Sequence, residues 1–333
     1  MIVTAILDPS VLDKSYFHAE AYRLQVKQFI RGISANGLLL ADHRKRLLGG
    51  LLTRIEELPT STGEELGIRI VEMLKKGRRR IIVCGNFKGS DELDVCRSIK
   101  SQCPHDVFIT TPENLRHYQS QRTAESSVIS IDDYFDSDFE KTRRYYAEEL
   151  PSLHRLSLDE CKDVFIRSTR YAKHLRIYDK QIGKGTDIPG FFRGIDFILG
   201  LWFEHGFFAS QGMAQVEIYT CEKCIVRPED AVHRAQEIKE NRRTVERIKD
   251  ELIAPLKEKY GRDIFLRVKH DANREFHARH LEAHAIILLL ERGFGFLRPD
   301  GIPKRAQVKV DNPARLDLQE YRELPSAEGS VPN

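Results

Sequence analysis

Short apolar segments alternate with amphipathic segments through the first 135 residues. The apolar runs predict five strands, at 2–7, 37–41, 80–84, 107–111 and 128–131. Apolar side chains that recur every three to four residues predict helices at about 15–32, 44–58, 63–76 and 91–101. Strands that alternate with helices are typical of a parallel sheet with helices on both faces. We therefore predict a three-layer α/β domain over residues 1–135, with a mostly parallel sheet.

The same alternation returns in the second half of the chain. Strands are expected near residues 174, 215, 264, 275 and 285, and helices at 157–170, 189–205 and 231–260. This pattern predicts a second three-layer α/β domain over residues 157–305. The charged segment 136–156 is expected to be a linker between the two domains. Residues 306–333 are rich in Pro, Glu and Ser, so we expect a largely extended or disordered tail.

Acidic residues stand at the ends of several elements of the first domain. Asp8 and Asp42 end two predicted strands, and two further acids, Asp91 and Asp94, lie in the first turn of a predicted helix. Because the carboxyl ends of parallel strands meet at one edge of a sheet, we expect these side chains to converge. Converging carboxylates would bind Mg²⁺ or Mn²⁺, which prefer oxygen ligands. The alternative is that the strand-end acids form turns and the helix acids complement the helix dipole.

This arrangement resembles a PIN-like nuclease domain. The resemblance covers about residues 1–135 and rests on the strand-end Asp, the acids that open a later helix, and a Thr-Thr pair that ends a strand. The family's last acid would fall near Thr111, where this sequence has none. The resemblance implies a metal-dependent nuclease. Its catalytic residues and metal ligands would be Asp8, Asp42, Asp91 and Asp94.

Histidines gather beside a buried-strand pattern in the second domain. The apolar run 285–290 and the segment 275–281 that precedes it both predict strands. His277 and Arg279 are two residues apart, so they would lie on the same face of a strand. Asp179, which follows the strand near 174, is expected to lie close to them. The candidate phosphate-binding residues are Arg279, His280, His284, Lys173 and Lys180.

The spacing in this stretch resembles a phospholipase D motif. The family's pattern is His, any residue, Lys, four residues and Asp, followed by an apolar strand and a glycine turn. Here His277, Arg279 and His284 have the same spacing. They precede the stretch Glu291–Phe296, Glu-Arg-Gly-Phe-Gly-Phe, which is similar to the ending of the MIT C-terminal domain. The resemblance covers about residues 156–300. It implies a phospholipase D-like mixed sheet, with His277 as a catalytic nucleophile and Arg279 as the residue that holds phosphate.

The composition indicates a partner that carries phosphate groups and argues against a membrane-spanning segment. The 333 residues carry a net charge of +3, and basic residues cluster at 76–80 and 167–184, a pattern that suits a phosphate backbone. We found no run of about 18 apolar residues, and the six cysteines are scattered, so we expect a cytoplasmic protein that does not enter a membrane. Cys221 and Cys224 have the spacing of half a zinc site, or of two ordinary thiols.

Two functions remain open from the sequence. The first is a nucleic-acid-binding protein, acting on RNA or DNA as a nuclease in bacterial antiviral defence. It would work with a partner protein and could form a homodimer. The second is a non-catalytic scaffold, or a module that binds phosphate or a lipid headgroup, and that works with a partner protein. Arg279 and His284, which stand where the phospholipase D pattern has Lys and Asp, favour the second function.

Overall fold

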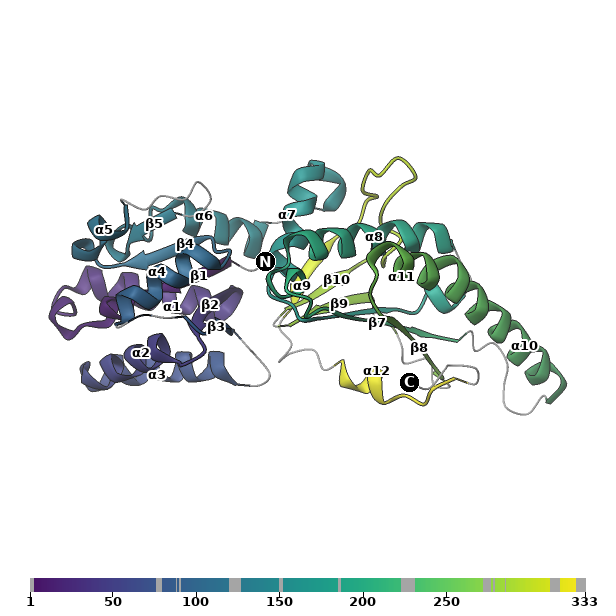
Figure 1. Ribbon diagram of the computed structural model, residues 1–333, viewed down its shortest axis with the longest axis horizontal. Helices are drawn as coiled ribbons and strands as arrows, with labels where there is room; N and C mark the ends of the chain where they lie inside the picture. Colours follow the sequence, from purple (N-terminus) through teal and green to yellow (C-terminus); the bar gives the residue numbers. More distant parts are fainter. Residues whose placement is uncertain are drawn as a thin grey trace. The chain divides into compact units, whose positions relative to one another are not determined.

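The computed structural model divides into two compact units, Met1–Leu150 and Pro151–Asn333. Each unit contains one sheet with helices packed against it (Figure 1). The residues that the structure describes are 3–75, 80–87, 89, 91–119, 127–149, 152–184, 187–222, 231–271, 277, 279–284, 286–311 and 318–327.

The first unit is a five-stranded parallel sheet in the order β3-β2-β1-β4-β5, as the alternating pattern predicted. The chain runs outward from β1 to β3 and then resumes on the other side of β1, so the order reverses between β1 and β4. The strands are β1 Val3–Leu7, β2 Gly37–Asp42, β3 Ile81–Gly85, β4 Val107–Thr110 and β5 Ser127–Ser130. The helices are α1 Glu20–Asn36, α2 Arg46–Glu57, α3 Thr60–Leu74, α4 Glu92–Gln102, α5 Pro112–Gln119 and α6 Asp138–Arg144.

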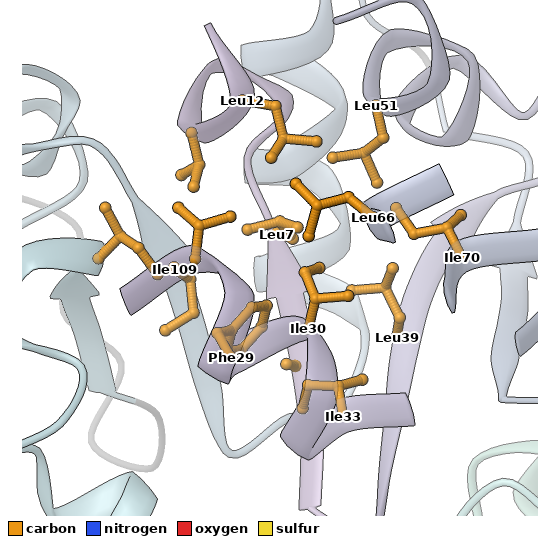
Figure 2. Close-up of a cluster of buried hydrophobic side chains, with 14 of the residues drawn as sticks. Leu7, Leu12, Phe29, Ile30, Ile33, Leu39, Leu51, Leu66, Ile70 and Ile109 are labelled. Atoms are coloured by element: carbon orange, nitrogen blue, oxygen red, sulfur yellow. The ribbon is translucent and has the colours of Figure 1, made fainter. Parts of the chain in front are cut away.

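One face of this sheet forms the main core of the unit (Figure 2). Val3, Ala5 and Leu7 alternate along β1, so their side chains all point to this face. They pack against apolar side chains of α1, α2 and α3. The opposite face contacts α4 and α5. There the rings of Phe108 in β4 and Tyr118 in α5 pack edge to face, with 4.3 Å between the ring centroids. These two helical layers give the predicted three-layer arrangement.

The segment expected to be a charged linker belongs in part to the first unit. Phe139 of α6 lies in the core of this unit, 6% exposed. The carboxylate of Glu140 accepts hydrogen bonds from Arg143 at 2.6 and 2.8 Å and from the hydroxyl of Tyr134. Burial would raise the pKa of Glu140, but these donors outweigh it and hold the pKa below its ordinary value. Two of the charges that suggested a linker, Glu140 and Arg143, therefore form a buried ion pair.

The second unit contains a mixed six-stranded sheet in the order β11-β10-β9-β6-β7-β8. Strands β6, β7 and β8 are parallel, whereas β9, β10 and β11 add antiparallel pairs. The strands are β6 His174–Asp179, β7 Gln215–Cys221, β8 Ile264–Lys269, β9 Arg279–Ala283, β10 Ile286–Leu290 and β11 Val308–Asp311. The helices are α7 Leu158–Thr169, α8 Ile188–His205, α9 Phe207–Ser210, α10 Ala231–Ile248, α11 Ala254–Tyr260 and α12 Gln319–Glu323.

Helices lie on both faces of this sheet. Figure 1 shows α8 and α11 on one face and α12 on the other. On the α8 side, Trp202 is fully buried and donates a hydrogen bond from Nε1 to the carbonyl of Ala172 at 3.1 Å. On the α12 side, Leu318 and Tyr321 pack against Tyr178 of β6.

The expected disordered tail contains parts of this fold. β11 pairs with β10, and the ammonium of Lys269 donates to the carbonyls of Arg322 and Leu324 at 2.7 and 2.9 Å, at the end of α12. The backbone N–H of Ala327 donates to Val268 of β8 at 3.0 Å. A strand of four residues and a helix of five are too short to produce a clear period in the sequence. The segment predicted to be largely extended or disordered thus includes an extended strand at 308–311 and a helix at 319–323.

Candidate functional sites

A pocket of about 380 Å³ opens at one end of the second sheet. Lys180 follows the carboxyl end of β6, and Arg279 stands at the start of β9, which is antiparallel to β6. The end of β10 and the start of β11 meet at the same place, because these strands pair in antiparallel register. The lining residues are Lys180, His277, Arg279, Leu289, Glu291, Gln307 and Lys309.

A buried carboxylate fixes one wall of this pocket. Asp179 is fully buried at the end of β6 and is the register partner of Arg279. Its Oδ1 accepts the N–H of Gln181 at 2.9 Å, and its Oδ2 accepts the N–H of Phe294 at 3.0 Å. Burial raises the pKa of Asp179 to about 6, although these backbone donors and the nearby cations oppose the shift. Asp179 thereby ties the turn after β10 to β6.

That turn requires glycine at its closest approach to the carboxylate. Gly293 has φ +67°, a left-handed conformation that favours glycine. A Cβ at this position would lie 2.1 Å from Oδ2 of Asp179. The Glu291-Arg292-Gly293 sequence therefore serves to bring the turn against Asp179.

This turn also orients the side chain of Arg279. A guanidinium N–H of Arg279 donates to the backbone carbonyl of Glu291 at 2.5 Å. Within the described residues this is the only side-chain hydrogen bond of Arg279, and a guanidinium has five N–H donors. The carboxylate of Glu291 is engaged elsewhere, because it accepts the backbone N–H of Gln307 at 3.2 Å. Arg279 therefore keeps donors for a ligand while its orientation is fixed.

The contact between Lys180 and His277 decides which nitrogen of the imidazole carries the proton. Nζ of Lys180 lies 2.5 Å from Nδ1 of His277. An ammonium can only donate, so Nδ1 accepts and the proton of the neutral ring is on Nε2. In this tautomer Nε2 is a hydrogen-bond donor and has no lone pair with which to attack phosphorus. The arrangement suits binding of an anion better than the nucleophilic role that the phospholipase D resemblance implies for His277.

The residues predicted to bind phosphate separate into two groups. Lys180 and Arg279 line the pocket together with His277. Because Leu175 pairs with Ala283 while Asp179 pairs with Arg279, Lys173 and His284 fall at the opposite end of the strands. Six residues of strand separate the two ends by roughly 20 Å.

The remaining predicted residues have other surroundings. The ammonium of Lys173 lies 4.3 Å from the ring centre of Phe208. His284 has φ +51° between β9 and β10. His280 is 9% exposed, pairs in register with Tyr178, and is not among the pocket-lining residues.

Sequence reasoning missed the contributions of β11 and α12. Gln307 and Lys309 line the pocket, and a backbone hydrogen bond joins the hydroxyl of Tyr321 to His277. The alternation in Gln-Val-Lys-Val, 307–310, is a strand pattern that could have revealed β11. The sequence carries no signal that would connect Tyr321 with His277.

In the first unit, Asp8 joins β1 to β4 where the strand order reverses. Ligand sites of parallel sheets occur at such reversals, beyond the carboxyl ends of the strands. Asp8 is 2% exposed, and its carboxylate accepts the N–H of Ser10 at 3.0 Å and the hydroxyl of Thr110 at 2.7 Å. The side-chain amide of Asn114 donates to both Asp8 and Ser10 at 3.1 Å.

Asp42 has a different set of donors. Its side chain is buried and accepts the backbone N–H of Leu47 at 3.1 Å, with Nε of Arg46 at 3.5 Å. Arg46 also donates to the carbonyls of Phe87 and Gly89 at 2.7 and 2.5 Å. Asp42 and Arg46 therefore hold the connection between β3 and α4.

The two helix acids have the roles that the alternative interpretation predicted. Asp91 is the N-cap of α4 and accepts the N–H of Asp94 at 2.8 Å, and Asp94 pairs with Arg97 at 3.3 Å. Among the described residues, no three His, Cys, Asp or Glu side chains form a group that could hold a metal ion. Mg²⁺ or Mn²⁺ binding remains a prediction.

One observation nevertheless connects the acids. The thiol of Cys96 in α4 is fully buried, and its pKa is raised well above the ordinary value, mainly by burial. Nearby negative charges raise it further. These charges belong to Asp8, Glu92, Asp42 and Asp91.

The predicted half zinc site cannot be assembled from the described residues. Cys221 at the end of β7 is buried and forms no disulfide within the described part of the chain, and Cys224 lies outside the described residues.

No family model, curated protein or solved structure matches the chain. The PIN-like and phospholipase D-like resemblances therefore remain predictions from sequence. None of the helices within the described ranges combines the length and apolarity that crossing a membrane requires.

Proposed function

We propose that the protein binds nucleic acid through its second unit, whose pocket holds phosphate without cleaving the strand. One observation carries this proposal: among the described residues, three basic side chains, Lys180, Arg279 and Lys309, line one pocket together with a single carboxylate, Glu291. Lys309 is exposed. Basic side chains that converge from several strands are suited to phosphate.

Three features support binding rather than turnover. The Nε2–H tautomer of His277 supplies a donor in place of a nucleophile. Arg279 is held by a backbone carbonyl, so its orientation costs little entropy when a phosphate arrives. The one carboxylate of the pocket accepts a backbone N–H and does not orient the imidazole.

The experiment is a fluorescence anisotropy titration of a labelled single-stranded oligonucleotide, as RNA and as DNA, over a series of salt concentrations. Arg279→Ala and Lys180→Ala should each weaken binding about tenfold, equivalent to about 1.4 kcal/mol. Each should also reduce the slope of log affinity against log salt by about one. The oligonucleotide should remain intact throughout.

Lys173→Ala is the matched control, because it removes the same charge at the opposite end of β6. Equal losses for Lys173→Ala and Lys180→Ala would mean that general surface charge binds the strand, and the pocket assignment would fail. Absence of oligonucleotide binding by the unmodified protein would refute the proposed function itself.

A second candidate function belongs to the first unit, where Mg²⁺ or Mn²⁺ would support strand cleavage. It is favoured by four acids, Asp8, Glu92, Asp42 and Asp91, whose negative charges all act on the buried thiol of Cys96, and by the reversal of strand order at Asp8. The buried hydroxyl of Tyr118 also has no hydrogen-bond partner in the described part of the chain, and the charges of Asp8 and Asp91 act on it. These residues would supply oxygen ligands for the cation.

Asp8→Asn tests this candidate, with Asp133→Asn, at an exposed position, as the control. Cleavage that requires Mn²⁺ and disappears only in Asp8→Asn would support it. Cleavage that survives Asp8→Asn, or that does not respond to Mn²⁺, would remove the first unit from the account.

A further inference from the structure

The pocket at the end of the second sheet has the size of a site for one nucleotide. Its volume of about 380 Å³ lies at the lower end of the range for small-molecule sites. Proteins that hold the interior of a single strand use long grooves in which bases stack on aromatic rings. The seven lining residues, all of them in the described part of the chain, include no aromatic ring. The pocket therefore favours the end of a strand over its interior.

The charge of the pocket also matches a strand end. Among the described lining residues, Lys180, Arg279 and Lys309 outnumber the one carboxylate, Glu291, by two charges. An internal phosphodiester carries one negative charge, whereas a terminal phosphomonoester carries about −1.5 to −2 at pH 7. A surplus of two charges is balanced by the terminal group and only half balanced by the internal one.

Asp179 lies behind this lining and does not face the pocket. Both oxygens of its carboxylate accept backbone N–H groups, and the side chain is fully buried. These two donors hold the Asp179 carboxylate against the turn after β10, and Asp179 is not among the described residues that line the pocket.

The hydrogen-bond donors that line the pocket come from different strands. Lys180 follows β6, Arg279 begins β9 and Lys309 lies in β11. Nε2 of His277 adds a further N–H donor. A terminal phosphate presents three oxygens to such donors, one more than an internal phosphodiester.

We infer that the pocket captures the terminal phosphomonoester of a nucleic-acid strand, with the first nucleotide inside the pocket and the rest of the strand outside. This inference rests on the proposed function. It specifies which part of the nucleic acid the pocket recognises. The binding breaks no covalent bond.

The experiment compares one labelled oligonucleotide in three forms, with a 5′-phosphate, with a 3′-phosphate and with hydroxyl groups at both ends, on the full-length protein. One phosphorylated form should bind about tenfold more tightly than the hydroxyl form. This preference should disappear in Arg279→Ala and fall in Lys309→Ala, and should persist in Arg298→Ala, where an exposed arginine of the same unit is removed. The fluorescence of the buried Trp202 verifies that each variant is folded.

Other outcomes separate the inference from the proposed function. Equal binding of the three forms, with dependence on Arg279 retained, would overturn the inference and leave the proposed function standing. No binding of any form would overturn both. Phosphatidylcholine vesicles that contain phosphatidic acid present the same phosphomonoester on a lipid. If they displace the phosphorylated oligonucleotide through Arg279 and bind more tightly, the ligand is a lipid headgroup and the inference is wrong.

Discussion

Replacement of Gly293 by alanine should destabilise the second unit through one identifiable contact. The new Cβ would lie 2.1 Å from the Asp179 carboxylate in a residue with φ +67°, so the turn or the carboxylate must move. The left-handed conformation costs an alanine about 1–2 kcal/mol. Loss of the hydrogen bond from Phe294 N–H to the carboxylate costs about 1.5–3 kcal/mol, since its acceptor is charged. We expect a total of about 3–4 kcal/mol.

The assay is urea unfolding followed by the fluorescence of Trp202, the single tryptophan of the chain, which lies in the second unit. Gly261→Ala is the control, because Gly261 has φ +57° and no atom lies within 4 Å of its expected Cβ. It should lose only the conformational term of about 1–2 kcal/mol. If the two variants lose the same stability, Asp179 does not anchor this turn, and the account of how Arg279 is oriented fails.

Two further predictions concern the same site. Folding raises the pKa of Asp179 from 3.8 to about 6. Between these pH values the folded protein binds more protons than the unfolded chain, so the Asp179 side chain favours folding most at low pH, where it is protonated. The contribution of Asp179 to the free energy of unfolding should therefore fall by about 3 kcal/mol as the pH rises from about 4 to 6. It is measured as the difference in stability between the unmodified protein and Asp179→Asn. Parallel pH profiles of the two proteins would contradict this prediction. Tyr321→Phe keeps the ring against Tyr178 but removes the hydrogen bond to the His277 backbone, so oligonucleotide affinity should fall several-fold while urea stability changes by less than about 1 kcal/mol. Unchanged affinity would show that α12 does not position His277.

The sequence was sufficient for most of the fold. Ten of the strands were expected near their observed positions, because most of them are short apolar runs bounded by polar residues or glycine. Contacts between residues that are far apart in the sequence were harder to predict, and so was the burial that depends on side-chain pairing. The charged residues of α6 suggested solvent exposure, but Glu140 and Arg143 are buried, and their pairing explains it.

The candidate site could be predicted only in part. His277 and Arg279 line one pocket, but β9 begins at Arg279, so His277 precedes the strand on which the two-residue spacing had placed it. The strand end at Asp179 was enough to place it beside Arg279. The register between β6 and β9 decides that His284 lies at the far end, and no local pattern fixes the register of strands about 100 residues apart. For the same reason, Lys309 enters the pocket through pairing that becomes visible only in the folded chain.

The phosphate-binding account is tested most directly by a crystal structure of the protein with a 5′-phosphorylated dinucleotide and another with the 3′-phosphorylated form. We predict a terminal phosphate in the pocket for one of the two, with its oxygens about 3 Å from the guanidinium of Arg279 and the ammonium of Lys180. A dinucleotide bound elsewhere on the protein in both structures, with no phosphate between these two side chains, would contradict the account.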